Sequence, residues 1–234
     1  MEIISLLFMF KPRPFLFILL LLNYYLVSCK REVTDLPLDL SPVLSFEKNP
    51  YSNWEIGYSL DTSLNPEKFR RSVFTNTSTL IGMWHPGAGS TLYYPYTGQN
   101  RDSVSILDIS TQWALRTRQI AMEGSNSGQY SLLRFLTPSP GTYRIKVTFE
   151  GIHFGLSSTD VHVLLNNTRL YDDLIEGYGG DPTFHPIIGT RPTITYEDLL
   201  TLVPGDIITI AVGYGPNKNH FNDTTGLLII LVKQ

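Results

Sequence analysis

The chain has 234 residues, of which 42% are hydrophobic and 17% charged, and its formal net charge is −3 at neutral pH. This length and composition suffice for a folded domain with its own hydrophobic core and exclude a wholly disordered chain. Basic residues form no cluster beyond Arg70 and Arg71, which argues against a nucleic-acid partner.

The N-terminal segment has the features of a lipoprotein signal peptide. Lys11 and Arg13 form a positive flank, an apolar run covers residues 15–27, and "LVSC" ends at Cys29, the only cysteine. We therefore expect residues 1–28 to be removed and Cys29 to be acylated, with palmitate among its acyl chains. This predicts a lipid-anchored protein at the bacterial outer membrane or cell surface.

Two alternatives stay open at this end. The apolar run could be an uncleaved membrane helix, although it is shorter than the about 20 residues that a span needs. Translation could also start at Met9, which would give a more ordinary signal peptide. Acylation of Cys29 would leave no thiol for a disulfide, so the exported fold would depend on its hydrophobic core.

Residues 29–43 are expected to be the lipidated cysteine and a flexible tether. The segment "KREVTDLPLDLSPV" mixes charges with prolines and has no sustained period. Residues 44–234 are expected to be one domain. Short runs rich in Val, Ile, Thr, Tyr and Phe recur between Gly, Pro and Asn, and none keeps a helical period over a helix length.

The predicted strands indicate an all-β protein. They lie, in chain order, at residues 54–60, 68–74, 79–84, 103–108, 130–137, 141–151, 159–166, 193–202, 206–215 and 226–233. The run "TYRIKVTFE" alternates apolar and polar residues, as a half-solvated antiparallel strand does. The run "GLLIILV" is apolar on both faces, which is typical of a central strand or one covered by a loop. About ten strands without a long helix predict two packed antiparallel sheets, a β-sandwich or jelly roll.

Aromatic residues gather in segments that are expected to contain loops, such as "NPYSNWEIGYS", "MWHPGAGSTLYYPYTGQN" and "VGYGPNKNHFNDTTGL". A flat ring can contact the apolar face of a sugar while neighbouring polar groups bind its hydroxyls. The candidate ligand-binding residues are Trp54, Tyr58, Trp84, His85, Tyr94 and Tyr214. The competing interpretation is that these rings belong to the core, where Trp and Tyr commonly lie.

Catalytic motifs are weak. No G-x-S-x-G segment is present, and Ser90 is near His85 only in a glycine-rich segment. A pair of carboxylates for glycoside hydrolysis could come from several acids, but most β-sandwiches offer as many; these acids are Asp102, Glu123, Asp160 and Asp223. We therefore assign no catalytic residue and expect a non-catalytic protein.

Metal-binding signals are also weak. The five histidines lie on separate segments without the short spacing of a transition-metal site. The segments "YDDLIEGYGGDP" and "FNDTTG" offer oxygen ligands on expected loops, so a structural calcium ion stays open. No other cofactor is expected.

A polar cluster is expected on the strand within "SSTDVHVLLNN". Asp160 and His162 share one strand face with Leu164, so that face is not simply exposed to solvent. A buried carboxylate needs a partner, which we expect to be backbone N–H groups, a cation or a group of the "NDTTGL" loop. In the last case Asp160 and His162 would form one polar cluster with Asp223 and Thr224. Both a structural tie and a ligand site stay open for the cluster.

Several segments resemble, in order, a poorly characterised domain family of secreted bacterial proteins. They are "NPYSNWEIGYS", "WHPGAGS", "LLRFLTPSPGTYRIKVTFEGI", "STDVHVLLNNTRLYDDLIEGYG", "LTLVPGDIITIAVGYGPN" and "FNDTTGLLIILV". Many members carry a PEP-CTERM-type sorting tail and others a lipoprotein signal. The resemblance covers nearly all of residues 46–234 and is most specific over 132–230. It implies a galactose-binding-like jelly roll, a fold used by many carbohydrate-binding modules.

The resemblance supplies no catalytic or binding residue. We expect this chain to be anchored at its N-terminus instead of by a sorting tail, and "AMEGSNSGQYSLLRF" stands where relatives often have a His-Pro-Gly turn. We expect a surface-exposed lipoprotein whose jelly roll binds glycan without catalysis and whose other partner is the membrane. The alternatives are a structural or adhesion protein of a surface assembly and a glycan-active enzyme that depends on Asp160, His162 and Asp223.

Overall fold

The computed structural model describes residues 37–42, 44–45, 47–75, 81–87 and 94–234. The predicted signal peptide, with its alternative start Met9, the lipidation site Cys29 and the weak nucleophile candidate Ser90 all lie outside these ranges. Within them, no helix is long and apolar enough to cross a membrane.

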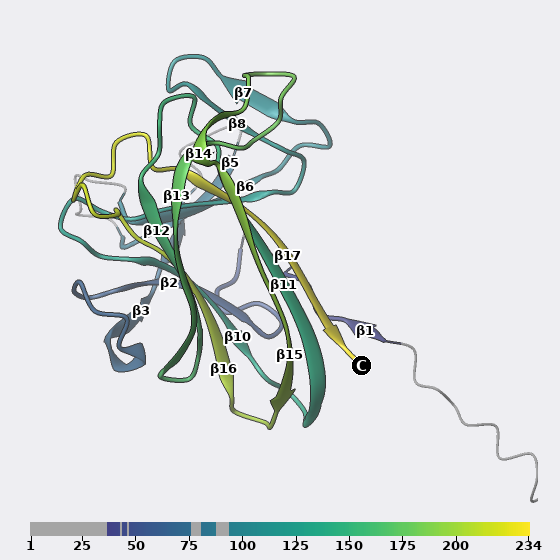
Figure 1. Cartoon of the computed structure of the whole chain (residues 1–234). Coiled ribbons are helices and arrows are strands. Elements are labelled where there is room, and N and C mark those ends of the chain that lie inside the picture. Colours follow the sequence, from purple (N-terminus) through teal and green to yellow (C-terminus); the bar gives the residue numbers. More distant parts are fainter. Residues whose placement is uncertain (1–36, 43, 46, 76–80, 88–93) are drawn as a thin grey trace, which may run out of the picture. The chain divides into compact units, whose positions relative to one another are not determined.

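Strands dominate the described chain, with one short 3₁₀ helix (Figure 1). The elements are β1 (Leu38–Asp39), β2 (Trp54–Ser59), η1 (Pro66–Lys68), β3 (Phe69–Arg71), β4 (Val73–Thr75), β5 (Ile81–His85), β6 (Tyr96–Asn100), β7 (Ile106–Asp108), β8 (Trp113–Leu115), β9 (Ile120–Glu123), β10 (Ser131–Leu136), β11 (Gly141–Gly151), β12 (Thr159–Leu165), β13 (Thr168–Tyr178), β14 (Ile188–Arg191), β15 (Thr193–Leu202), β16 (Ile207–Val212) and β17 (Thr225–Lys233).

Two antiparallel sheets pack face to face, and their strand order is that of a jelly roll. One sheet contains the order β9-β17-β11-β15 and the other the order β10-β16-β12-β13. From β9 to β12 the chain changes sheet at every strand. β13 and β14 stay in the second sheet, and the chain changes sheet again at β15, at β16 and at β17. Eight antiparallel strands connected in this way define a jelly roll, so the predicted fold class is confirmed.

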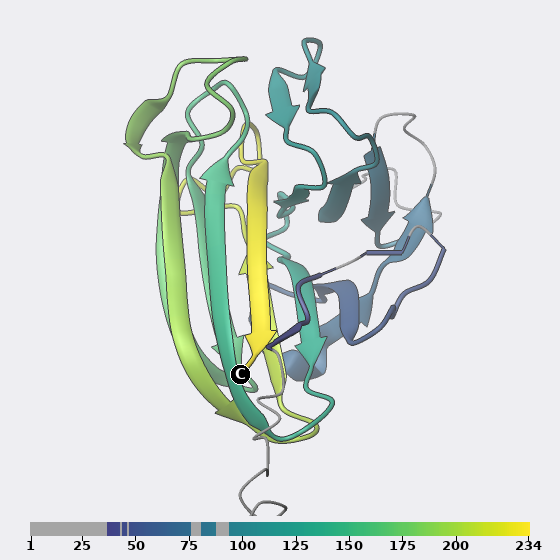
Figure 2. The ribbon, with the colours of Figure 1, turned by 90° about the vertical axis from the view of Figure 1, so that its right-hand side faces the viewer.

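Further strands extend both sheets beyond the jelly roll. β6, β5 and β4 continue the first sheet from β9, and β2 and β3 continue the second from β10. β14 pairs with β13, and β7 and β8 form a separate hairpin. Figure 2 shows the long strands of the sandwich and, beside them, the shorter strands of the first half of the chain.

Alternating side chains build the core between the sheets, as the pattern of β11 predicts. Tyr143, Ile145, Val147 and Phe149 point inward and are fully buried, and they pack with residues of the opposite sheet such as Phe135. Burial of such side chains is the main stabilising contribution in a fold of this kind.

β17, the strand of "GLLIILV", is central because β9 and β11 pair with it on either side. Its inner residues Leu227 and Leu231 are buried. Its outer residues Leu228 and Ile230 are 41% and 50% exposed. Its place in the sheet explains the apolar inner residues, whereas the described residues do not cover the apolar outer face.

β13 was not predicted. The prediction that "YDDLIEGYGGDP" is a loop that could bind calcium is wrong for most of that segment, which is a strand. Tyr171 to Tyr178 continue β13, which pairs with β12 and β14. Asp172 and Glu176 are tolerated because their side chains lie on exposed positions of the strand. An acidic strand near a sheet edge lacks the apolar alternation that the prediction required.

The expected tether also differs from the structure at its end. Leu38 and Asp39 pair with β17, and the N–H group of Leu40 donates to the carbonyl of Leu231 at 2.7 Å. The indole N–H of Trp54 donates to the carbonyl of Leu40 at 3.0 Å. The compact unit therefore begins at Pro37, ahead of the expected boundary at Leu44.

Candidate functional site

A cavity of about 440 Å³ lies at one end of the sandwich. The end of β5, the start of β6, the β9–β10 turn and the β16–β17 loop meet there because the strands concerned are antiparallel. The described residues that line the cavity are Pro86, Tyr94, Ser125, Asn126, Ser127, Gln129 and His220. One wall is thus aromatic, and the other lining side chains are mostly neutral hydrogen-bonding groups.

The β9–β10 turn supplies four of these residues. The N–H of Gly128 donates to the carbonyl of Ser125 at 2.9 Å, and the N–H of Gln129 donates to the Ser125 hydroxyl at 3.2 Å. Gly128 has φ +79°, and a Cβ there would lie 2.6 Å from a methyl group of Thr62. Ser125 Oγ and Ser127 Oγ are 2.7 Å apart. The turn is therefore tightly fixed and presents two adjacent hydroxyls.

The floor of the cavity contains a buried polar network. His220 Nδ1 is 2.9 Å from Glu123 Oε1, and the Thr224 hydroxyl donates to Glu123 Oε2 at 2.5 Å. Burial raises the pKa of Glu123, although the bonds to His220 and Thr224 oppose this. The His220 ring also lies 4.2 Å from the ring of Tyr94 and 4.8 Å from that of Phe221. Its position is therefore fixed from three directions.

Asp223 lies beside this network and is fully buried. Its Oδ1 accepts from the N–H of Ser158 at 2.8 Å, whereas Oδ2 has no hydrogen-bond partner among the described residues. Burial, with a further contribution from the charge of Glu123, raises the pKa of Asp223 to about 7. In the described part of the chain, no three His, Cys, Asp or Glu side chains are grouped to hold a metal ion.

Asp160 and His162 form a different cluster. His162 Nε2 and the Tyr130 hydroxyl each lie 2.8 Å from Asp160 Oδ2, and the N–H of Gly215 donates to Asp160 Oδ1 at 2.7 Å. His162 Nδ1 contacts Asp172 Oδ1. Although burial acts in the opposite direction, these hydrogen bonds lower the pKa of Asp160.

The expected single polar cluster is thus divided in two. Asp160 and His162 do meet, but Thr224 hydrogen-bonds Glu123, and no hydrogen bond joins the pair to Asp223 in the described residues. The two clusters lie close together but are not bonded to each other. Asp160 fixes the start of the β16–β17 loop, and Asp223 lies near the end of that loop.

Trp54 and Trp84 lie in the core, contrary to their candidate role at a ligand. Trp54 is 3% exposed and its ring lies 5.2 Å from Phe135. Trp84 is fully buried and its ring lies 5.3 Å from Phe74. Both point inward from strands. Successive side chains of a strand point to opposite faces of the sheet, so a side chain on the inner face cannot present its ring to solvent.

Of the six candidate ligand-binding residues, the cavity includes Tyr94 alone. His85 is buried beside it, where its Nδ1 accepts from the N–H of Gly87 at 3.2 Å, and burial lowers its pKa. Tyr58 is half-buried in β2 and is not among the lining residues. The half-buried Tyr214 supports the turn from behind, because its hydroxyl lies 3.0 Å from the position of a Cβ on Gly128.

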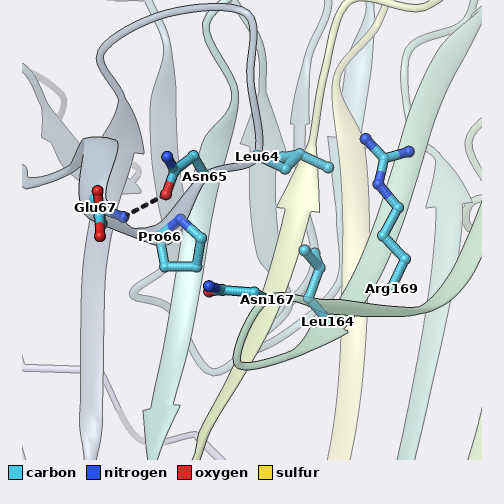
Figure 3. A pocket seen from close by; sticks show the side chains of 7 residues that line it. All are labelled: Leu64, Asn65, Pro66, Glu67, Leu164, Asn167 and Arg169. Carbon is cyan, nitrogen blue, oxygen red and sulfur yellow. Dashed lines mark hydrogen bonds between the residues drawn. The ribbon is translucent and has the colours of Figure 1, made fainter.

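A second hollow of about 380 Å³ lies between η1 and the β12–β13 hairpin (Figure 3). Its lining residues are Leu64, Asn65, Pro66, Glu67, Leu164, Asn167 and Arg169. Figure 3 shows the Asn65 amide oxygen accepting the N–H of Glu67, at 2.9 Å, so that part of its polar wall is already used. None of these seven residues is aromatic, which makes this hollow less suited to a sugar ring than the cavity of Tyr94.

The sequence matches no protein-family model and no curated protein. Among solved structures, it is similar to a family 51 carbohydrate-binding module from Clostridium perfringens, solved with methyl-galactose, with TM-score 0.33, 8% identity and coverage of 56% of this chain and 79% of that one. A family 35 carbohydrate-binding module from Clostridium thermocellum gives TM-score 0.29 and 10% identity, with coverage of 55% and 86%. Similarity at this level supports no inference about a ligand, and the jelly-roll assignment follows from the strand order of this chain.

Proposed function

We propose that the protein binds a sugar residue of a glycan in the cavity beside Tyr94. The observation that carries this proposal is the combination, in one cavity, of an aromatic ring with the hydroxyl and amide side chains of Ser125, Asn126, Ser127 and Gln129. A ring contacts the apolar face of a sugar, and such neutral groups pair with its hydroxyls in a fixed orientation.

Size and charge favour a neutral sugar. The cavity, at about 440 Å³, falls within the roughly 300–1,000 Å³ that small-molecule sites usually have. None of the seven described lining residues is Lys, Arg, Asp or Glu, so the lining offers no fixed counter-charge for a phosphate, a carboxylate or an ammonium group. Sugar hydroxyls need only the neutral donors and acceptors that are present.

The same proposal places the protein in the bacterial cell envelope as a lipoprotein acylated at Cys29. The lipobox-like "LVSC" supports it. Leu38 pairs with Lys233 at one end of β17, and the other end, Thr225, adjoins the cavity floor. At roughly 3.3 Å per residue, the eight steps along this strand separate β1 from the cavity floor by roughly 26 Å. The first described strand and the cavity therefore lie at opposite ends of β17.

A glycan array followed by calorimetric titration tests the sugar proposal. We expect binding to at least one neutral glycan and competition by its free monosaccharide, because the cavity holds a short portion of a chain. Absence of binding across plant, algal and microbial polysaccharides would contradict it. A pull-down that captures protein partners in that case would favour the structural or adhesion role.

A further inference from the structure

The His220 side chain is held in an arrangement that the binding of a sugar does not require. His220 and Glu123 have side chains that are only 7% and 6% exposed, and Nδ1 lies 2.9 Å from Glu123 Oε1. A hydrogen bond to a carboxylate oxygen requires the proton on Nδ1, which leaves a lone pair on Nε2 of the neutral ring. Nε2 forms no hydrogen bond with any residue that the structure describes, while the ring lines the cavity.

Glu123 bonds the imidazole through one carboxylate oxygen and a hydroxyl group through the other. Its second oxygen, Oε2, already accepts from Thr224 at 2.5 Å, and the Tyr96 hydroxyl lies 3.4 Å from that threonine oxygen. The carboxylate is thus oriented by Thr224 and separated from the cavity by the ring that it supports. A base oriented by a buried carboxylate is the arrangement that general-base catalysis uses.

Neutral donors surround this base. The Asn126 amide oxygen accepts from the N–H of His220 at 3.3 Å, and its NH₂ group has no hydrogen bond to any residue that the structure describes. Ser125 and Ser127 bring two hydroxyls, and Gln129 a second amide, although these groups also hydrogen-bond one another and the Gln129 NH₂ group donates to the Leu60 carbonyl at 3.4 Å. Donors aimed at a cavity can stabilise the oxyanion that forms when a nucleophile adds to a carbonyl group.

The residues that line the cavity limit the reactions in which His220 could act as a base. Glycoside hydrolysis needs two carboxyl groups at the scissile bond, and none of the described lining residues carries one. Removal of a proton next to a sugar carboxylate would need a cation to neutralise the charge, and the described lining offers no Lys or Arg. Hydrolysis of an ester needs one base and neutral oxyanion donors, and the cavity has both.

We propose that this cavity hydrolyses ester groups carried by the bound glycan, such as O-acetyl groups, with His220 as general base. His220 Nε2 takes a proton from a water molecule whose oxygen adds to the ester carbonyl carbon. The bond from that carbon to the sugar oxygen then breaks, and the imidazolium returns the proton to the sugar oxygen. The products are a carboxylic acid and a free hydroxyl. Glu123 is a positioning residue. The inference depends on the proposed sugar binding.

The test uses the full chain, purified in mild detergent, with an acetylated polysaccharide and a per-O-acetylated methyl glycoside as probes. Acetate release is followed by NMR. We expect release by the wild type and a loss of about 10²–10⁴-fold in His220→Gln. The matched control is His185→Gln, a histidine that is not among the lining residues and is expected to match the wild type. Melting curves identify a variant that does not fold.

Glu123→Gln separates positioning from folding, because its amide oxygen can still accept from Nδ1–H. We expect a lower kcat with a nearly unchanged KM. Melting curves should show a folded variant, because the amide keeps a bond to the ring. A purely structural role for Glu123 would instead lower the melting temperature and leave the kcat of the folded protein unchanged.

Two results would overturn the ester proposal. One is sugar binding by calorimetry without acetate release above that of a denatured sample, which leaves the binding proposal intact. The other is release that persists unchanged in a folded His220→Gln variant. Absence of both binding and release would instead contradict the sugar proposal on which the inference depends.

Discussion

Individual side chains at the cavity end differ in how strongly burial changes their acid–base behaviour. Asp160 is surrounded by donors, so its pKa is lowered despite burial, whereas Asp223 has a bare Oδ2 and a pKa raised to about 7. Burial also raises the pKa of Tyr94 to about 12, so its hydroxyl stays protonated at any physiological pH. The two aspartates differ because Asp223 is fully buried beside the charge of Glu123, whereas the Asp160 side chain is 18% exposed and accepts three hydrogen bonds.

Asp223→Asn is expected to change how stability depends on pH. A carboxyl whose pKa is raised on folding stabilises the fold below its unfolded pKa of 3.8, and this contribution is lost as pH rises to about 7. A shift of this size corresponds to a loss on the order of 4 kcal/mol. The asparagine variant should lack that loss and be more stable than the wild type at pH 8.

Urea unfolding between pH 4 and 8 measures this difference. Asp102→Asn, at an exposed position, is the control and should follow the wild type. If Asp223→Asn and the wild type lose stability in parallel between pH 4 and 7, Asp223 does not carry the raised pKa.

Trp84→Ala tests whether this ring belongs to the core or to a site. Because Trp84 is fully buried and packs on Phe74, its truncation should lower the free energy of unfolding by about 3–5 kcal/mol. Chemical denaturation measures the loss. Unchanged stability together with lost sugar binding would return Trp84 to the ligand face.

Elements are tied together at the cavity end by side chains rather than by strand pairing. Asp160 of β12 holds Gly215 through Oδ1 and Tyr130 through Oδ2, so one carboxylate fixes the start of the β16–β17 loop and the residue before β10. Gly215 has φ +68°, which favours glycine and lets its N–H reach the carboxylate. The loops of the cavity are therefore positioned from β12.

Asp160→Ala is expected to loosen the β16–β17 loop without unfolding the sandwich. The change removes the acceptor of three hydrogen bonds, each worth about 1 kcal/mol or more when one partner is charged. Hydrogen exchange should become faster at the Gly215 amide and stay slow within β11. Equal protection of Gly215 in both proteins would show that the loop is held by other contacts.

Strand prediction succeeded for strands with one apolar face. It failed for strands near a sheet edge or at the cavity end, where the residues do not follow that pattern. β11 and β15 have the predicted bounds, whereas β6, β9 and β13 were not predicted. β13 could have been recognised from its likeness to β15, because "YDDL" and "YEDL" occupy equivalent positions in the two strands. In each, the tyrosine hydroxyl and the leucine N–H bond the aspartate between them.

The site was less predictable than the fold. Tyr94 was a candidate and does line the cavity, but Ser125, Asn126, Ser127 and Gln129 were not. Their segment "SNSGQ" has the composition of any polar turn, so nothing local marks it as a site. Its importance follows from the long-range pairing that brings it to His220.

For the compact unit as a whole, β17 links the first described strand to the cavity end. β1 pairs with the end of β17, and the cavity lies near its start. Leu228 and Ile230 on its outer face are exposed, and the described residues leave this face open.

Cys29→Ser is expected to abolish lipid attachment and membrane association. The serine hydroxyl cannot form the thioether through which the diacylglyceryl group is attached. Metabolic labelling with a palmitate analogue and detergent phase partitioning measure the two effects. Labelling that survives the substitution, or a wild type found free of the membrane fraction, would contradict the lipoprotein proposal.

The central claim is that the cavity beside Tyr94 binds a sugar, and a calorimetric titration of matched variants with one glycan tests it most directly. Tyr94→Ala should weaken binding by at least tenfold, because the ring supplies the aromatic wall. Tyr51→Ala changes an exposed tyrosine just before the start of β2, at the end of that strand away from the cavity. This variant should bind as the wild type does. Equal affinity of folded Tyr94→Ala and the wild type would contradict the claim.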